Sequence, residues 1–153
     1  MKRKHLFCTL FLFLTFLSVG RVWAQYDKQQ FFYRGQQLIF DGRFQQAIDN
    51  FNKLIQLDPE LYEAYFFRGI GKYNLGDFLG AKSDFDKALS INPVFTMAYH
   101  YRAITYSRLG QYDNALEDLQ EAVDLRPSYN GLYFSRGVTY LLSQQFELAE
   151  ADF

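Results

Sequence analysis

Few side chains in this sequence could act as nucleophiles or as metal ligands. The chain has one cysteine, Cys8, and two histidines, His5 and His100. A cysteine–histidine pair and a multi-ligand metal site both need several such groups close together. Cys8 and His5 lie in a segment that we expect to be removed, which leaves His100 alone. We therefore expect no metal and no cofactor, and we interpret His100 as a packing or groove residue.

Carboxylates cluster in the second half of the chain, where Glu117, Glu121 and Asp124 follow one another at helical spacing. Acid–base catalysis needs two carboxyl groups in opposed environments within a cleft. These three share the outward face of one expected helix, which is typical of a solvated surface. The sequence also has no glycine-rich phosphate loop and no serine-hydrolase elbow. We therefore expect that the protein is not an enzyme.

The first 24 residues have the three parts of a secretory signal peptide. Basic residues at positions 2–4 precede a run of 14 residues without charge, 6–19, and Val22-Trp23-Ala24 follows. The run is shorter than the ~20 residues that cross a bilayer as a helix. We predict cleavage after Ala24, giving a secreted or periplasmic protein of the Gram-negative export type with no integral membrane span. An uncleaved membrane anchor is the alternative.

The remaining chain is mildly acidic. Four of the 16 basic residues lie in the first 24 positions and none of the 17 acidic ones does, which leaves 12 against 17, a net charge of −5. Nucleic-acid binding requires a basic face, so we expect no nucleic-acid partner. Hydrophobic residues make up 49% of the sequence, which is enough to bury a core.

The chain repeats itself with a period of 34 residues, which is the spacing of Pro59, Pro93 and Pro127. This period is typical of a repeat built from two helices. Other residue types keep the same step. They are the arginines Arg34, Arg68, Arg102 and Arg136, the alanines Ala47, Ala81, Ala115 and Ala149, and three aromatic or apolar rows beginning at Phe31, Phe44 and Phe51.

Each repeat is expected to form two helices, for example residues 61–74 and 78–91. Gly76 suits a left-handed cap after the first helix, and Asp77 suits the N-cap of the second. Glycine also follows the first helix at positions 42 and 110, whereas Gln144 breaks that series. Small residues on the first helices should face the repeated alanines of the second helices; they are Gly35, Gly69, Ala103 and Gly137.

From about Lys28 onward, this pattern resembles the tetratricopeptide repeat family. The repeats would be 28–61, 62–95, 96–129 and 130–153, the last stopping at its twenty-fourth position. Position 4 is always aromatic, position 20 is always Ala, and position 32 is Pro wherever the chain reaches it. Position 7 departs from the family because it is Arg instead of Leu, and Leu38 and Lys72 depart at position 11, where the family has Tyr.

The resemblance implies an all-α, right-handed superhelix whose first helices line a concave groove for a peptide or a partner helix. The family's groove positions here are mostly apolar, which suits an amphipathic helix or an extended apolar segment. Phenylalanine at position 5 in three repeats argues against the family's carboxylate clamp. Alternatively, the rings pack on adjacent helices and leave no continuous patch. The expected groove residues are Phe32, Phe66, Ile70, Tyr73, His100, Ile104, Arg108, Phe134 and Val138, together with Ile39, Phe40, Met97, Leu141 and Leu142.

The arginine at position 7 needs a hydrogen-bond acceptor if it is even partly buried. Position 23 offers one in every repeat, so we predict a ladder of pairs between first and second helices, within or between repeats. Exposed arginines whose stems cover the aromatic rings are the alternative. The four acceptors are Asn50, Asp84, Asp118 and Asp152.

The sequence thus favours an exported interaction scaffold that binds a protein or peptide. Two alternatives stay open: an N-terminal portion of a larger exported protein with a catalytic or envelope-binding domain, and a structural block that self-associates. Because 130–153 has no polar terminal cap, we expect it to be the frayed end of the array.

The exported form should contain neither tryptophan nor cysteine, because Trp23 and Cys8 both precede the expected cleavage point. Tryptophan-selective excitation should give no emission from the mature protein, whereas the uncleaved precursor should emit. The intact mass should correspond to a chain that begins at Gln25. A mass that includes residues 1–24 would contradict the cleavage.

Overall fold

A computed structural model describes residues 28–153, so the predicted signal peptide lies outside the described residues. Within that range every regular element is a helix. None of the described helices has the length and apolar character needed to span a membrane. A first helix covers residues 28–40, and the helices after it are α2 (Phe44–Leu57), α3 (Tyr62–Asn74), α4 (Phe78–Ile91), α5 (Thr96–Arg108), α6 (Tyr112–Leu125), α7 (Asn130–Leu142) and α8 (Phe146–Asp152).

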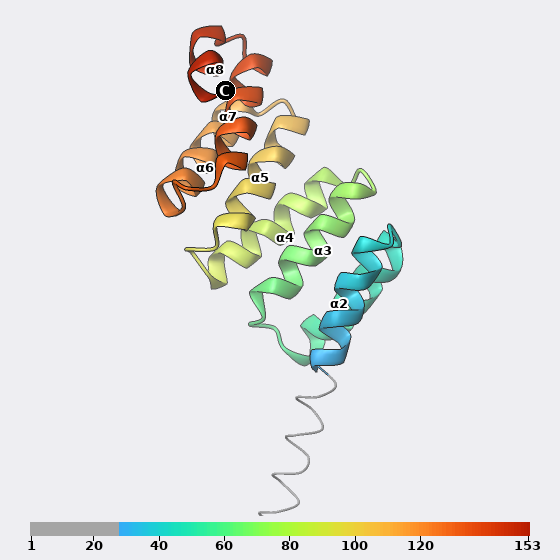
Figure 1. The fold of residues 1–153 in the computed structure, drawn as a ribbon. Helices are drawn as coiled ribbons and strands as arrows, with labels where there is room; N and C mark the ends of the chain where they lie inside the picture. The colour runs from blue at the N-terminus through green and yellow to red at the C-terminus, as the bar shows by residue number, and fades with distance from the viewer. Residues whose placement is uncertain (1–27) are drawn as a thin grey trace, which may run out of the picture.

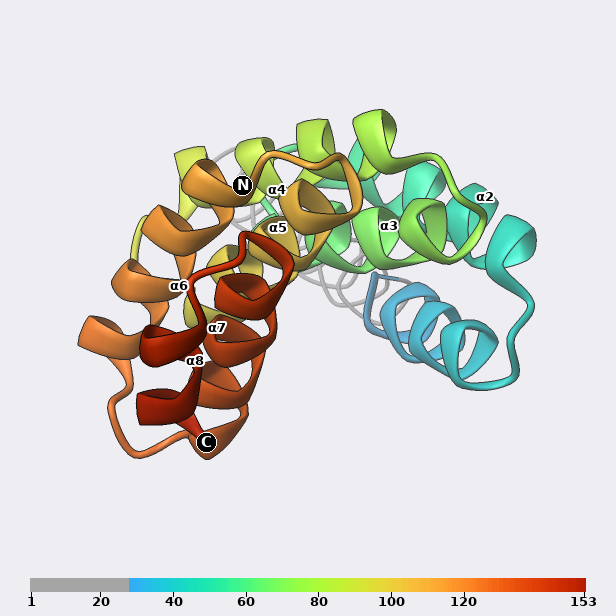
Figure 2. The same cartoon turned by 90° about the horizontal axis from the view of Figure 1, so that it is seen from above.

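The helices stack one after another into a solenoid, which confirms the predicted all-α architecture (Figure 1). Each helix packs on the next, and in addition α3 contacts α5 and α5 contacts α7. Seen from above, the array is an arch with α3, α5 and α7 along its inner side and α4 and α6 outside (Figure 2). The helices that begin each repeat therefore form the concave layer, and the second helices form the convex layer.

The turns between the two helices of each repeat share a left-handed residue. Gly42, Gly76 and Gly110 have φ values of 72°, 82° and 73°, and Gln144 occupies the same place with φ of 62°. A residue with a side chain in this conformation costs roughly 1–2 kcal/mol, so the last turn is the most strained of the four. At the second turn, the Gly80 N–H donates to Asp77 Oδ1 at 2.9 Å, which is the predicted N-cap.

The small residues of the first helices do not face the alanines that we expected. Their closest neighbours are the side chains at position 24 of the same repeat. A Cβ added at Gly69 would lie 2.7 Å from Phe85 Cε1, and one at Gly35 would lie 2.5 Å from Phe51 Cζ. The third repeat has Ala103 packed with Leu119 instead. The larger residue is thus matched with glycine and the smaller one with alanine, and the sum of the two sizes stays similar.

The predicted arginine ladder is present in three repeats. Arg102 Nε and Nη2 donate to the two oxygens of Asp118 at 2.7 and 2.6 Å. Arg68 binds Asp84 in the same way at 2.9 and 2.5 Å, and Arg136 binds Asp152 at 2.7 and 2.6 Å. The three aspartates are nearly buried, with side-chain exposures of 4–7%. Such bidentate pairs fix geometry as well as charge.

Each guanidinium also reaches back to the preceding repeat. Nη1 of Arg102 donates to Asp86 Oδ1 at 2.7 Å, and the equivalent atoms of Arg68 and Arg136 donate to Asn52 at 2.8 Å and Gln120 at 2.8 Å. These acceptors all stand at position 25, on the second helix of the repeat before. Desolvation would lower the pKa of Arg102, but the hydrogen bonds and charges of Asp118 and Asp86 outweigh it and raise the pKa.

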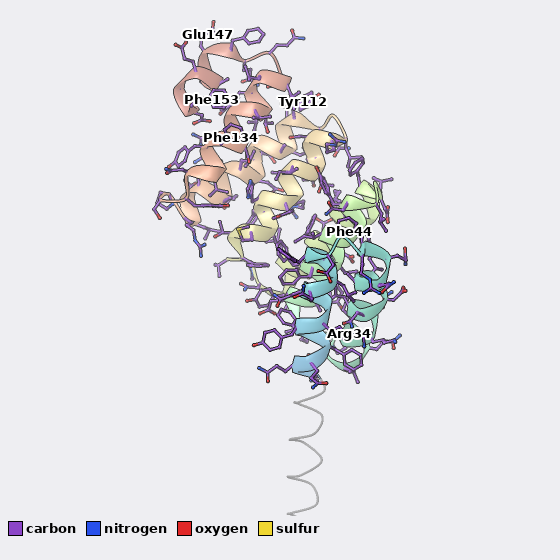
Figure 3. All side chains as sticks on the ribbon, turned by 45° about the vertical axis from the view of Figure 1, so that its right-hand side comes forward. Arg34, Phe44, Tyr112, Phe134, Glu147 and Phe153 are labelled. Atoms are coloured by element: carbon purple, nitrogen blue, oxygen red, sulfur yellow. The ribbon has the colours of Figure 1, made fainter. Side chains whose placement is uncertain are left out.

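The ladder is not formed in the first repeat. Position 23 is Asn50 there, and its buried Oδ1 has no hydrogen-bond partner within the described part of the chain. Arg34 is exposed and lies at the end of the array opposite Phe153 (Figure 3). An amide offers no charge to a guanidinium, so the first arginine gains less from desolvation than the other three.

The glycine–aromatic match predicts a strong coupling between Gly69 and Phe85. Gly69→Ala should lower the free energy of unfolding by about 1–2 kcal/mol, because overpacking costs more than the helix propensity of alanine returns. Adding Phe85→Leu should restore most of that loss, since the pair then copies Ala103 and Leu119 of the third repeat. Urea unfolding of the two single variants and the double variant measures the coupling. Purely additive effects would show that the two side chains do not restrict each other.

The ladder predicts that Arg102→Leu destabilises the protein by about 3 kcal/mol, because it leaves the buried Asp118 without its counter-charge. Replacing Asp118 by Leu as well should recover part of the loss. Arg126→Leu is the matched control, since Arg126 is exposed in the loop after α6, and it should change stability by less than about 0.5 kcal/mol. Equal unfolding midpoints for Arg102→Leu and the control would contradict a stabilising ladder.

Candidate functional site

Four of the predicted groove residues line one cavity on the concave layer. Ile104 and Arg108 of α5 face Phe134 and Val138 of α7 around a volume of about 470 Å³. The remaining wall consists of Phe78, Ser107, Tyr112, Ser135, Thr139 and Leu142. The cavity lies at the junction of the third and fourth repeats.

The cavity exists because small hydroxyl side chains replace rings at this junction. Ser135 stands at position 6 of its repeat, where the other repeats have Tyr33, Phe67 and Tyr101. Ser107 stands at position 12, where the other repeats have Ile39, Tyr73 and Leu141. Missing side-chain volume in a packed layer leaves open space. Composition at two positions therefore opens the concave layer here.

The same layer is closed between the second and third repeats, where the prediction of an open groove is wrong. Phe66 and Ile70 are only 5% and 8% exposed. The Phe66 ring packs against Phe95 and Tyr101, with centroids 4.9 and 5.4 Å apart. The alternative that the rings pack on adjacent helices therefore holds in this part of the array. Phe66 and Ile70 are core residues.

Phe32 and Tyr73 are half-buried and contribute edges to the concave layer. The Phe32 ring packs edge-on against Phe67 at 5.6 Å between centroids, and the Tyr73 ring packs against Phe78 at 5.4 Å. Among the other expected groove residues, Ile39 and Met97 are half-buried. Phe40, Leu141 and Leu142 are exposed by 86%, 44% and 50%.

His100 lies behind the cavity wall and is 8% exposed, so it is a packing residue. Its Nε2 lies 2.7 Å from Ser135 Oγ, while its Nδ1 is buried without a hydrogen-bond partner in the described structure. Burial lowers the pKa of His100 below its usual value, because the charged ring would be poorly solvated. The ring is therefore neutral at neutral pH, and the expectation that it lines the open groove is wrong.

The hydroxyl groups of the cavity wall are already engaged with one another and with the backbone. Ser107 Oγ and Thr139 Oγ1 lie 3.2 Å apart, and Thr139 Oγ1 donates to the Ser135 carbonyl at 2.8 Å. The wall is thus polar in composition, but its hydroxyls have partners within the protein. The most exposed apolar side chain of the wall is Phe134, which is 62% exposed and whose ring centroid lies 5.8 Å from that of Phe153 (Figure 3).

Arg108 is the only charged residue among those lining the cavity. Its guanidinium carbon lies 5.5 Å from the centroid of the Phe78 ring, a cation–π arrangement that positions the charge at the rim. Sequence reasoning missed Phe78 and Tyr112 because it considered only the first helices. Both belong to the aromatic row at position 17, beginning at Phe44, so the 34-residue periodicity contained the signal that could have found them.

A second cavity lies away from the concave layer, between the turn at residues 110–114 and the turn at residues 142–145. It has a volume of about 490 Å³ and a mostly polar wall. Among residues 28–153 no cluster of three or more His, Cys, Asp or Glu side chains is placed to hold a metal ion. The concave cavity is therefore the best-formed candidate for a binding site, since it combines an apolar wall with few polar groups.

Comparison with known proteins gives the same repeat boundaries for the middle of the chain. Residues 62–95 and 97–129 each match a family model described as tetratricopeptide repeat. No curated protein matches the sequence significantly.

Solved structures share the architecture. The crystal structure of MamA superposes with a TM-score of 0.76 at 23% identity, covering 82% of this chain and 74% of that one. TTC0263, a thermophilic TPR protein of Thermus thermophilus, gives 0.75 at 24% identity, covering 82% and 70%. The first TPR of Spaghetti (RPAP3), bound to the HSP90 peptide SRMEEVD, gives 0.70 at 23% identity, covering 78% and 93%.

Proposed function

The chain is a tetratricopeptide repeat protein, and from this premise we propose that it is an interaction scaffold that binds a peptide segment in the concave cavity between α5 and α7. The single observation that carries the proposal is the open, largely apolar wall around Phe134, Ile104 and Val138. An exposed ring beside a cavity is the usual anchor point of a protein interface. A structural neighbour holds a peptide, which supports a peptide or protein as the class of partner.

The proposed scaffold acts by presenting a rigid surface and requires no bond-making step. The arginine ladder holds the second helices at fixed spacing, and the packed rings around Phe66 fix α3 against α5. A preformed cavity loses little conformational entropy when a ligand binds. We further propose, from the composition of residues 1–24, that the scaffold works outside the cytoplasm.

Peptides selected from a random library against the whole exported chain provide the test. Phe134→Ala should weaken the affinity of a selected peptide by about 1–2 kcal/mol, as removal of an aromatic anchor does. Phe146→Ala is the matched control, because its ring is 60% exposed, close to the 62% of Phe134, but it does not line the cavity. Affinities from fluorescence anisotropy give the comparison.

The convex face supplies the opposite outcome. Glu117 and Glu121 are exposed on α6, on the outer side of the arch. If reversing these two charges abolished binding while Phe134→Ala left the affinity unchanged, the ligand would occupy the convex surface and the concave proposal would be wrong.

A further inference from the structure

The charged groups around the concave cavity differ from those elsewhere in the array in one respect. Arg68, Arg102 and Arg136 each pair with an aspartate, and Lys82 pairs with Asp86 at 2.8 Å. Arg108 forms no ion pair with any residue that the structure describes. The side chain is exposed, and its guanidinium is oriented by the Phe78 ring. A positioned cation with free donors therefore lies at the cavity rim.

The repeats show that this charge is not required by the fold. Arg108 occupies position 13, where the second repeat has Asn74 and the fourth has Leu142. Asn74 bonds to the backbone of its own helix, with Nδ2 donating to the Ile70 carbonyl at 2.8 Å. Arg108 does lie in the last turn of α5, where a cation interacts favourably with the helix dipole. That interaction leaves most of its five N–H donors free for a ligand.

The rest of the cavity wall determines what can lie next to a bound anion. Ile104, Val138 and Leu142 provide apolar surface, and the hydroxyls already have partners. A small inorganic anion would leave this apolar surface uncovered. A peptide segment would cover it with one side chain while a neighbouring carboxylate reached the guanidinium.

We propose that the cavity selects peptide segments in which an aliphatic or aromatic side chain is closely followed or preceded by Asp or Glu. The apolar side chain occupies the space between α5 and α7, and the acidic side chain pairs with Arg108. This inference rests on the proposed function, because it names the chemistry of the ligand at the same cavity. The chain after residue 24 carries a net charge of −5, so its overall field does not favour an acidic ligand. Any preference for acid must therefore come from the local guanidinium.

The experiment uses a random peptide library displayed with its C-terminus fused to the phage coat protein. Every peptide carboxylate then comes from Asp or Glu. The baits are the exported chain, its Arg108→Glu variant and its Arg126→Glu variant. Arg126→Glu is the matched control because it makes the same charge change at an exposed residue at the C-terminal end of α6, outside the cavity. The measurement is the frequency of acidic and basic residues within two positions of the enriched apolar residue.

We expect the unaltered chain and Arg126→Glu to enrich Asp and Glu, and Arg108→Glu to enrich Lys and Arg instead. For one synthetic selected peptide, Arg108→Glu should weaken binding about tenfold, because hydrogen bonds to charged groups are among the stronger ones. Exchanging the acidic residue of that peptide for Lys should reverse the order of the two proteins.

Two other outcomes would overturn the inference in different ways. Apolar peptides enriched equally on all three baits, and lost with Phe134→Ala, would refute selection by Arg108 while leaving the proposed function in place. No enrichment on any bait, or enrichment that survives Phe134→Ala, would refute both.

Discussion

The array depends on one constraint, which is that each buried guanidinium must satisfy acceptors on two successive second helices at once. Arg102 can reach Asp118 and Asp86 together only if α6 and α4 lie at one separation and one rotation. Bidentate geometry leaves little freedom in either. Where the wider family relies on a packed leucine, this chain sets the pitch of the stack with polar contacts of defined direction. The concave layer inherits that pitch, because each first helix is packed on its own second helix.

Within the frame set by the ladder, side-chain size decides where the concave layer is filled. Phe66 is covered because Phe95 and Tyr101 pack against it. One repeat later the residues that contact His100 are Ser135 and Tyr129, and the volume of a ring is missing. The chain therefore keeps the helix positions nearly constant and varies the contents between them. A closed core and an open cavity arise from the same backbone geometry.

The period, the helix pairs, the Asp77 cap and the Arg–Asp pairs could be predicted from the sequence, because each follows from residues at fixed positions within one repeat. What failed involved neighbours that the period does not specify. The glycines were assigned to the alanines, although the bulk of Phe51 and Phe85 leaves them as the rings' partners. The second acceptor of each arginine went unnoticed because Asn52, Asp86 and Gln120 share only an oxygen acceptor. Position 5 could not show that Phe66 is covered and Phe134 exposed, because that difference depends on residues elsewhere in the stack.

The two-sided hydrogen bonding of the arginines also makes the unit from Tyr62 to Phe95 interchangeable along the chain. This unit contains its own donor, Arg68, an acceptor for it, Asp84, and a further acceptor for the next unit, Asp86. A duplicated copy placed directly after Phe95 would find Asp86 behind it and would offer the same group to Arg102. Every guanidinium would keep two acceptors, and no interface of a new kind would be created. Such self-matching edges allow a gene to lengthen its product in steps of 34 codons without redesigning the contacts on either side.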